Sequence, residues 1–129
     1  MKVGFTGTRK GMSQSQKEQF VLKLFELGIT EFHHGDCIGA DADAHDIVRE
    51  FFPHVKIIIH PPEKTHTRAF KTGDFYHITK PYIVRDKDIV NDTEYLVGSP
   101  HGSEIIRSGT WTTIRYARKI GRTHTVLER

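Results

Sequence analysis

The stretch that decides the fold class of this sequence is Val55-Lys56-Ile57-Ile58-Ile59. Most of its residues are β-branched, and Ile57–Ile59 are apolar at consecutive positions. Because neighbouring side chains of a strand point to opposite faces, this run predicts a strand buried on both faces of a parallel sheet. Four other segments have a strand pattern: Lys2–Thr6, Glu31–His34, Glu94–Gly98 and Thr123–Leu127.

Helical segments separate these five strands. Ser13 and Gln16 have the spacing of a capping box, and the apolar periodicity after them predicts a helix that ends at Gly28. Further helices are expected over Ala44–Phe52, Pro81–Val90 and Thr110–Lys119. This alternation predicts an α/β fold, a Rossmann-like three-layer α/β/α sandwich with a parallel sheet of about five strands. Residues 60–80 lack periodicity, which is typical of a functional or a disordered loop.

Length and composition predict one domain over residues 1–129, long enough to bury a core. The one cysteine, Cys37, excludes a disulfide framework and a multi-cysteine zinc module. No apolar run is long enough to span a membrane and no signal-peptide pattern is present, so we expect a cytoplasmic protein with no membrane partner. The net charge of +3 and the isoelectric point of about 9.1 fit an anionic ligand and do not require nucleic acid.

Ligands of such sheets bind beyond the carboxyl ends of the strands. The first strand is followed there by Gly7-Thr8-Arg9-Lys10-Gly11, which predicts a phosphate site. Its glycines allow the backbone to approach an anion closely, and Arg9 can clamp a phosphate through two hydrogen bonds. The alternative is a simple turn with a surface arginine, since the stretch matches neither a Walker motif nor G-x-G-x-x-G.

The second strand is followed by Gly35-Asp36-Cys37-Ile38-Gly39-Ala40-Asp41. The ligand-binding residues predicted here are Gly35, Asp36, Gly39 and Asp41, because the carboxylates can accept hydrogen bonds from ribose hydroxyls. Asp36 is also the candidate for general acid–base catalysis. Asp41 has the alternative role of a helix cap, and Cys37 is more typical of a packing residue than of a nucleophile.

The third turn, Arg107-Ser108-Gly109-Thr110, opens the last helix and predicts another anion site. Its alternative is an ordinary helix cap by Ser108 or Thr110. His34 and His60 fall at strand ends, where they are predicted to line the site. No metal ligands are predicted, because the adjacent His33 and His34 point to opposite faces and only one of them could join a common site.

Five stretches carry a resemblance to a known family: Val3–Ser13, His33–Asp41, His60–Pro62, Lys80–Val90 and Arg107–Arg118. Together they resemble the YpsA-related branch of the SLOG superfamily, which also includes the LOG phosphoribohydrolases and the DprA and Smf proteins. The resemblance covers Val3 to about Leu127. It implies a Rossmann-like fold that binds a nucleotide or nucleotide-derived ligand, with Arg85 among the ligand-binding residues.

The LOG enzymes of this superfamily bind phosphate and obtain a catalytic glutamate from a Gly-Gly-x-Gly-Thr-x-x-Glu stretch. Gly109 and Thr110 match its Gly-Thr pair, and Thr113 stands at the glutamate position. A threonine cannot carry the negative charge that would stabilise an oxocarbenium-like transition state. This departure argues against LOG-type N-glycosidic hydrolysis by the same residues.

Three functions follow from these patterns. The first is binding of a nucleoside monophosphate, ADP-ribose or an NAD-related signal by a sensor or sequestering protein that needs no cofactor. The second is a nucleotide-processing hydrolase of the phosphoribohydrolase or N-glycosidase type, and the third is DprA-like nucleic-acid binding, which the modest charge disfavours. A homo-oligomer is also expected, with Trp111, Tyr116 and the loop Phe70–Tyr76 as candidate interface anchors. The long loop over residues 60–80 could instead be a lid over the ligand, a role that its basic residues Lys64, Arg68 and Lys71 would suit.

Overall fold

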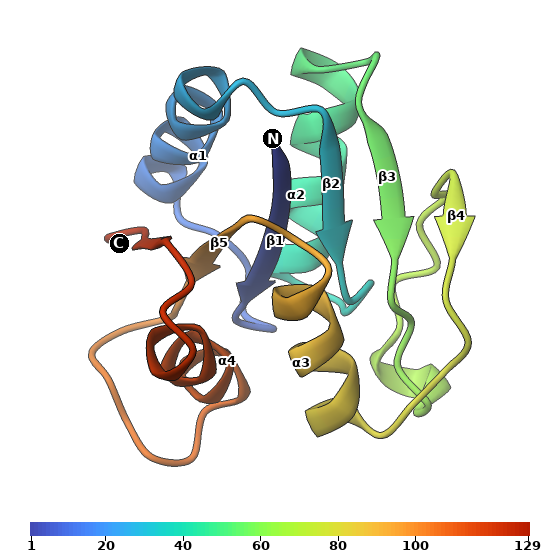
Figure 1. Cartoon of the computed structure of the whole chain (residues 1–129), viewed down its shortest axis with the longest axis vertical. Helices are drawn as coiled ribbons and strands as arrows, with labels where there is room; N and C mark the ends of the chain where they lie inside the picture. The colour runs from blue at the N-terminus through green and yellow to red at the C-terminus, as the bar shows by residue number, and fades with distance from the viewer.

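Six parallel strands form one sheet in the computed structural model, which describes residues 1–129 (Figure 1). Across the sheet the strands run in the order β4-β3-β2-β1-β5-β6. In chain order they are β1 (Lys2–Gly7), β2 (Glu31–His34), β3 (Lys56–Ile59), β4 (Phe75–Tyr76), β5 (Tyr95–Ser99) and β6 (His124–Val126).

Four α-helices cover the two faces of this sheet. They are α1 (Gln14–Leu27), α2 (Ala40–Phe51), α3 (Tyr82–Asn91) and α4 (Gly109–Lys119). Helices α1 and α2 pack together on one face, and α3 and α4 pack together on the other (Figure 1). The predicted three-layer α/β/α sandwich with a parallel sheet is therefore confirmed.

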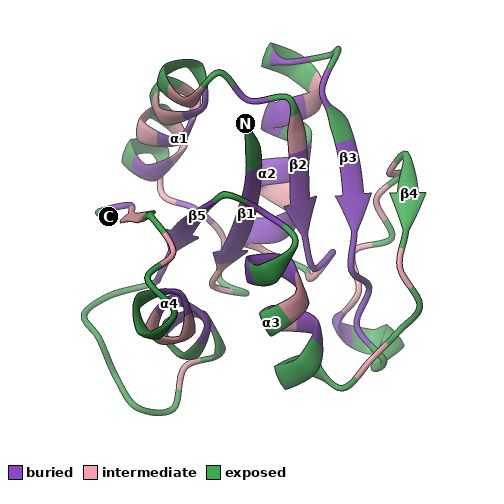
Figure 2. Ribbon diagram, in the orientation of Figure 1, coloured by how far each residue is buried: buried purple, intermediate pink, exposed green.

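The core divides into two parts because successive side chains of each strand alternate between the faces. Val3, Phe5 and Phe32 join the larger cluster, where Phe5 meets Phe20 of α1 edge-to-face at 5.3 Å between ring centroids. On the other face, Leu96 packs in a smaller cluster with residues of α3 and α4. The four inner strands, β3, β2, β1 and β5, are accordingly buried over most of their length, whereas the edge strand β4 is exposed (Figure 2).

The count of strands differs from the prediction, since residues 60–80 contribute a sixth. This segment contains a 3-10 turn, η1 (Thr65–Thr67), and the two-residue strand β4, which pairs with β3 at the edge of the sheet. Both residues of β4 are exposed. An exposed pair has no alternation of apolar and polar side chains, so the sequence pattern could not reveal it.

The helix boundaries follow the predicted signals at α1 and depart from them at α2. The Ser13 hydroxyl accepts from the Gln16 amide and the Gln16 side chain accepts from the Ser13 amide, and Gly28 ends the helix in the left-handed conformation. Helix α2 begins at Ala40, four residues before its predicted apolar pattern. Asp41 therefore lies inside its first turn and is not the residue that caps it.

Helix α2 begins in direct contact with the turn after β1. A Cβ at Gly7 would lie 2.5 Å from the Cβ of Ala40, and a Cβ at Gly39 would lie 2.2 Å from the carbonyl oxygen of Arg9. The Ala40 amide donates to the Thr8 carbonyl at 2.9 Å. This close packing lies where the strand order reverses, between β1 and its neighbour β5, which is the usual ligand position in such sheets.

A further observation concerns helix length and polarity. None of the helices combines the length and the low charge that crossing a bilayer would require.

A substitution at Gly39 tests this close approach. Gly39→Ala should lower the free energy of unfolding by about 3 kcal/mol, because its φ of +92° strains an alanine and the Arg9 carbonyl leaves no room for a Cβ. Gly28→Ala is the matched control, since it also has a positive φ but no atom within 4 Å of an added Cβ, and it should cost about 1 kcal/mol. Urea unfolding measures both, and equal losses would contradict the steric argument.

Candidate functional site

A cleft of about 610 Å³ opens at the carboxyl edge of the sheet, at the point where the strand order reverses. The loops after β1, β2 and β5 each contribute to it, together with the segment after β3 and one side of α3. Ten of the fourteen residues predicted to bind the ligand line it: Gly7, Thr8, Arg9, Lys10, Gly35, Asp41, Arg85, Ser108, Gly109 and Thr110. Asp36, Gly39, His60 and Arg107 do not.

The turn after β1 has a fixed backbone and free cationic side chains. The Thr8 carbonyl accepts from the amides of Gly11 and Ala40, and the Thr8 hydroxyl accepts from the Lys10 amide. Arg9 and Lys10 are exposed at the cleft and make no side-chain hydrogen bond or ion pair. Their charges are therefore available to an anion.

The N-terminus of α4 faces the same cleft. Ser108 caps this helix by accepting from the Trp111 amide, and the first turn contains no acidic side chain. The amides of Gly109 and Thr110 have no partner within the helix, because the first N–H groups of any helix lack one. Together with the helix dipole, they favour a negative group in the cleft.

Arg85 is nearly buried between α3 and the turn after β2. Its Nη1 donates to the Gly35 carbonyl at 3.2 Å and to Cys37 Sγ at 3.5 Å, and its Nη2 pairs with Asp86 at 3.1 Å. The remaining guanidinium nitrogen, Nε, is buried and has no protein partner. Arg85 therefore holds the Gly35 turn in place and keeps one donor unused.

Two carboxyl groups of the cleft bind protons more tightly than usual. Burial raises the pKa of Asp41 to about 7, although Arg85 and the Cys37 amide oppose this shift. Burial also raises the pKa of Asp86, against Arg85 and Thr113. Asp86 belongs to α3 and lies close to Thr113 of α4.

Cys37 also lines the cleft, and its thiol is inert at neutral pH. Burial raises its pKa to about 11, with Asp41 contributing in the same direction. The thiolate is the nucleophilic form of cysteine, so this environment favours the predicted packing role.

Asp36, the predicted acid–base residue, does not line the cleft. Its side chain is fully buried, where it accepts from Arg68 Nε and from the Lys71 amide, each at 3.0 Å. Its carbonyl accepts from the Ala69 amide at 2.7 Å. Every one of these partners lies in the segment after β3, so Asp36 anchors that segment. This position does not fit the predicted role of Asp36 in acid–base catalysis.

The segment anchored by Asp36 lies within residues 60–80, which the sequence marked as a possible lid without identifying which of its residues would line the cleft. It brings Pro62, Glu63, Lys64 and Thr67 to the cleft as a wall, and the Lys64 side chain makes no ion pair. The lining is completed by residues of β1 and α3 and one residue after β5: Phe5, Thr6, Tyr82, Ile89 and His101. This wall is held by contacts between residues that are distant in sequence. The pattern of residues 60–80 therefore could not predict where the segment lies. The mixture of basic and polar residues in this segment was the one feature of the sequence that could indicate a functional role.

The other predicted residues have different places. Gly39 lies behind the cleft, where it packs on Arg9, and Arg107 is exposed outside it. His34 is buried on the α2 side, accepting from the Asp36 amide and contacting His45 at 3.0 Å. His60 is buried on the α3 side, as described below. Both histidines are hidden by helices that cover the sheet.

Trp111 also differs from its predicted role as an interface anchor. It is buried in the smaller core cluster, and its indole N–H donates to the Gly102 carbonyl. Tyr116 is half-buried and donates to Asn91. Phe70, Phe75 and Tyr76 are exposed.

Comparison with known proteins supports the fold alone. No family model matches the chain, and no curated protein is similar to it. The X-ray structure of TM1055, a target of the Northeast Structural Genomics Consortium, superposes with a TM-score of 0.62. The match covers 95% of this chain and 71% of that chain at 16% sequence identity, and it is compatible with a Rossmann-like fold.

Substitution of Asp36 tests its role as an anchor. Asp36→Asn should lower the free energy of unfolding by about 3 kcal/mol, because it leaves Arg68 without its buried counter-charge. Asp46→Asn is the control: it removes an exposed partner of Lys71 and should change stability by less than about 1 kcal/mol. Chemical denaturation measures both, and an Asp36→Asn protein as stable as the parent would refute the anchor.

Proposed function

We propose that this chain binds a nucleotide or a nucleotide-derived ligand, such as a nucleoside monophosphate, ADP-ribose or an NAD-related molecule, as a sensor or sequestering protein of the SLOG superfamily. The observation that carries the proposal is the convergence of three unpaired cations, Arg9, Lys10 and Lys64, with the N-terminus of α4 on one cleft. Many of the other Lys and Arg side chains form ion pairs with carboxylates. Examples are Arg49 with Asp74 and Lys80 with Asp88.

The shape and polarity of the cleft support a small ligand with phosphate and sugar groups. Its volume of about 610 Å³ falls in the usual range for small-molecule sites, roughly 300–1,000 Å³. Asp41 and the Ser108 hydroxyl lie on its lining, where they can bond sugar hydroxyls. Because three unpaired cations, Arg9, Lys10 and Lys64, gather in this one cleft, its lining favours a small anion as the ligand.

Ligand-dependent stabilisation tests this proposal. AMP, ADP-ribose and NAD at millimolar concentration should raise the melting temperature of the full chain, since a ligand at about 100 times its dissociation constant adds roughly 2.7 kcal/mol. Arg9→Ala should lower the affinity for whichever of these ligands stabilises the chain by about tenfold or more, because one charge-assisted phosphate contact is lost.

Lys119→Ala is the matched control for this experiment. Lys119 is an exposed, unpaired cation at the far end of α4, so its removal changes net charge equally and leaves the cleft intact. No stabilisation by any of the three ligands would refute the proposal, as would equal losses of affinity in the two variants.

Asp41 favours a second candidate function, hydrolysis of an N-glycosidic bond in the same ligand class. A carboxyl group with a pKa of about 7 is protonated in a useful fraction at neutral pH and can donate to a leaving base. This role passes to Asp41 from Asp36, because Asp41 lines the cleft and Asp36 does not.

Chromatography after long incubation with AMP and NAD measures this activity. If the chain turns over, the released base should disappear in Asp41→Asn, and the rate of the parent should fall as pH rises above about 7, since Asp41 then loses its proton. An Asp41→Asn rate equal to that of the parent would exclude Asp41 as the acid. Binding without any product would leave the sensor function as the explanation.

A further inference from the structure

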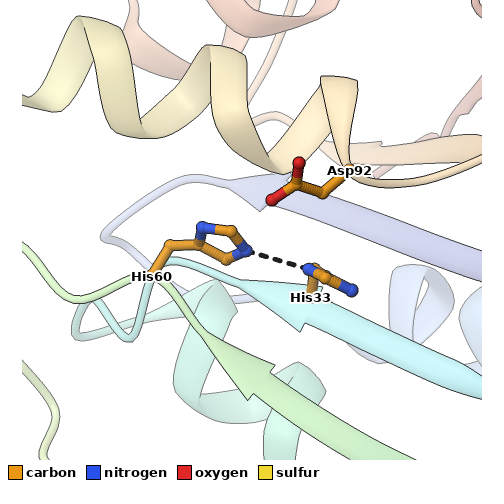
Figure 3. A group of neighbouring side chains, drawn as sticks. All are labelled: His33, His60 and Asp92. Atoms are coloured by element: carbon orange, nitrogen blue, oxygen red, sulfur yellow. Dashed lines mark hydrogen bonds between the residues drawn. The ribbon is translucent and has the colours of Figure 1, made fainter. Parts of the chain in front are cut away.

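Two histidines and an aspartate meet on the sheet face that α3 covers, outside the cleft (Figure 3). His33 belongs to β2, His60 directly follows β3, and Asp92 caps the end of α3. His33 Nδ1 and His60 Nε2 are 2.9 Å apart, and the Asp92 carboxylate faces this pair from the helix layer. One ligand atom from each of the three residues lies within 4.8 Å of the others.

The fold itself creates this meeting. His33 and His60 point to the same face because side chains alternate along each strand and β2 and β3 are paired in register, with His34 opposite Ile59. Gly4, opposite His33 on β1, has no side chain, and a Cβ there would lie 2.8 Å from Thr93 Oγ1. The missing side chain lets the end of α3 approach the sheet, which brings Asp92 to the imidazoles.

Glu31 fixes the state of His33. Its carboxylate lies 2.8 Å from His33 Nε2, and an ionised carboxylate only accepts, so Nε2 carries the proton. The neutral His33 ring therefore directs the lone pair of Nδ1 toward His60 Nε2, which lies 2.9 Å away. A carboxylate behind the distal nitrogen of a histidine is the usual outer partner in metal sites, where it orients the ring and raises its basicity.

Asp92 is the member of the cluster that reaches solvent. Its side chain is 43% exposed, whereas His33 and His60 are buried, and its carboxylate lies 3.8 Å from His77 Nε2. His77 stacks on His60 with ring centroids 4.1 Å apart, so its ring restrains the His60 ring.

We propose that His33 Nδ1, His60 Nε2 and the Asp92 carboxylate bind a divalent transition-metal ion of the zinc class. The His60 proton moves from Nε2 to Nδ1, so that both nitrogens facing the ion are unprotonated and both rings stay neutral. Imidazole with one carboxylate suits Zn²⁺ and Co²⁺ rather than Mg²⁺ or Ca²⁺, which prefer all-oxygen sites. Three protein ligands leave a coordination position open to water.

Metal titration of the full chain, without a polyhistidine tag and after treatment with a chelator, tests this site. Calorimetry should show one Zn²⁺ per chain with micromolar or tighter affinity, and Co²⁺ should give a visible absorption band. Asp92→Asn should weaken Zn²⁺ by at least about tenfold, and His60→Gln should abolish the site. Glu31→Gln should weaken it by about 10–100-fold through the orientation of His33.

His45→Gln is the matched control. His34 and His45 form the other buried imidazole pair of this chain, 3.0 Å apart on the opposite face of the sheet, and no carboxylate completes a metal cluster there. This variant should bind Zn²⁺ like the parent. Because Asp92 is exposed, Asp92→Asn keeps the test valid even if His60→Gln unfolds.

Three results would overturn the proposal. They are the absence of stoichiometric Zn²⁺ binding by the parent chain, equal Zn²⁺ affinity of Asp92→Asn and the parent, and loss of the ion in His45→Gln. The proposal does not depend on the nucleotide site, since none of the three ligands lines the cleft.

Discussion

The close contact between the turn after β1 and the start of α2 is the constraint on which the candidate site depends. Ala40 leaves no space for a Cβ at Gly7, and the Arg9 carbonyl leaves none at Gly39, so the two backbone segments pack directly against each other. The Thr8 carbonyl receives the Ala40 amide and thereby joins the two turns. Because this contact fixes the backbone, the Arg9 side chain carries no structural duty and is left for an anion.

The buried carboxylate of Asp36 fixes the segment after β3, just as the close packing at the glycines fixes the turn after β1. Its hydrogen bonds to Arg68 and the Lys71 amide hold the segment after β3, which brings Lys64 to the same cleft as Arg9 and Lys10. A buried carboxylate that accepts these two hydrogen bonds is unavailable for proton transfer. Asp41, which stays in the cleft, is the carboxyl group whose environment suits that chemistry.

Local signals predicted the architecture well because they act within one element. The Val55–Ile59 run predicted a strand buried on both faces, and Ser13 with Gln16 predicted the start of α1. Strand β4 escaped prediction because its two exposed residues pair with β3 only after the chain has folded back. The start of α2 was misplaced, since its first turn contains Asp41 and Asp43 in place of the apolar residues on which the pattern relied.

The sequence by itself determined the α/β order, the parallel sheet and most of the loops that line the cleft, because side-chain periodicity and strand-end glycines report on local geometry. Only the tertiary structure decided which polar residues share an environment. Asp36 and Asp41 stand five positions apart, yet one is locked to Arg68 and the other faces the cleft. His33, His60 and Asp92 are distant in sequence and meet through strand register and the gap at Gly4. Such proximity depends on long-range packing, which no local pattern encodes.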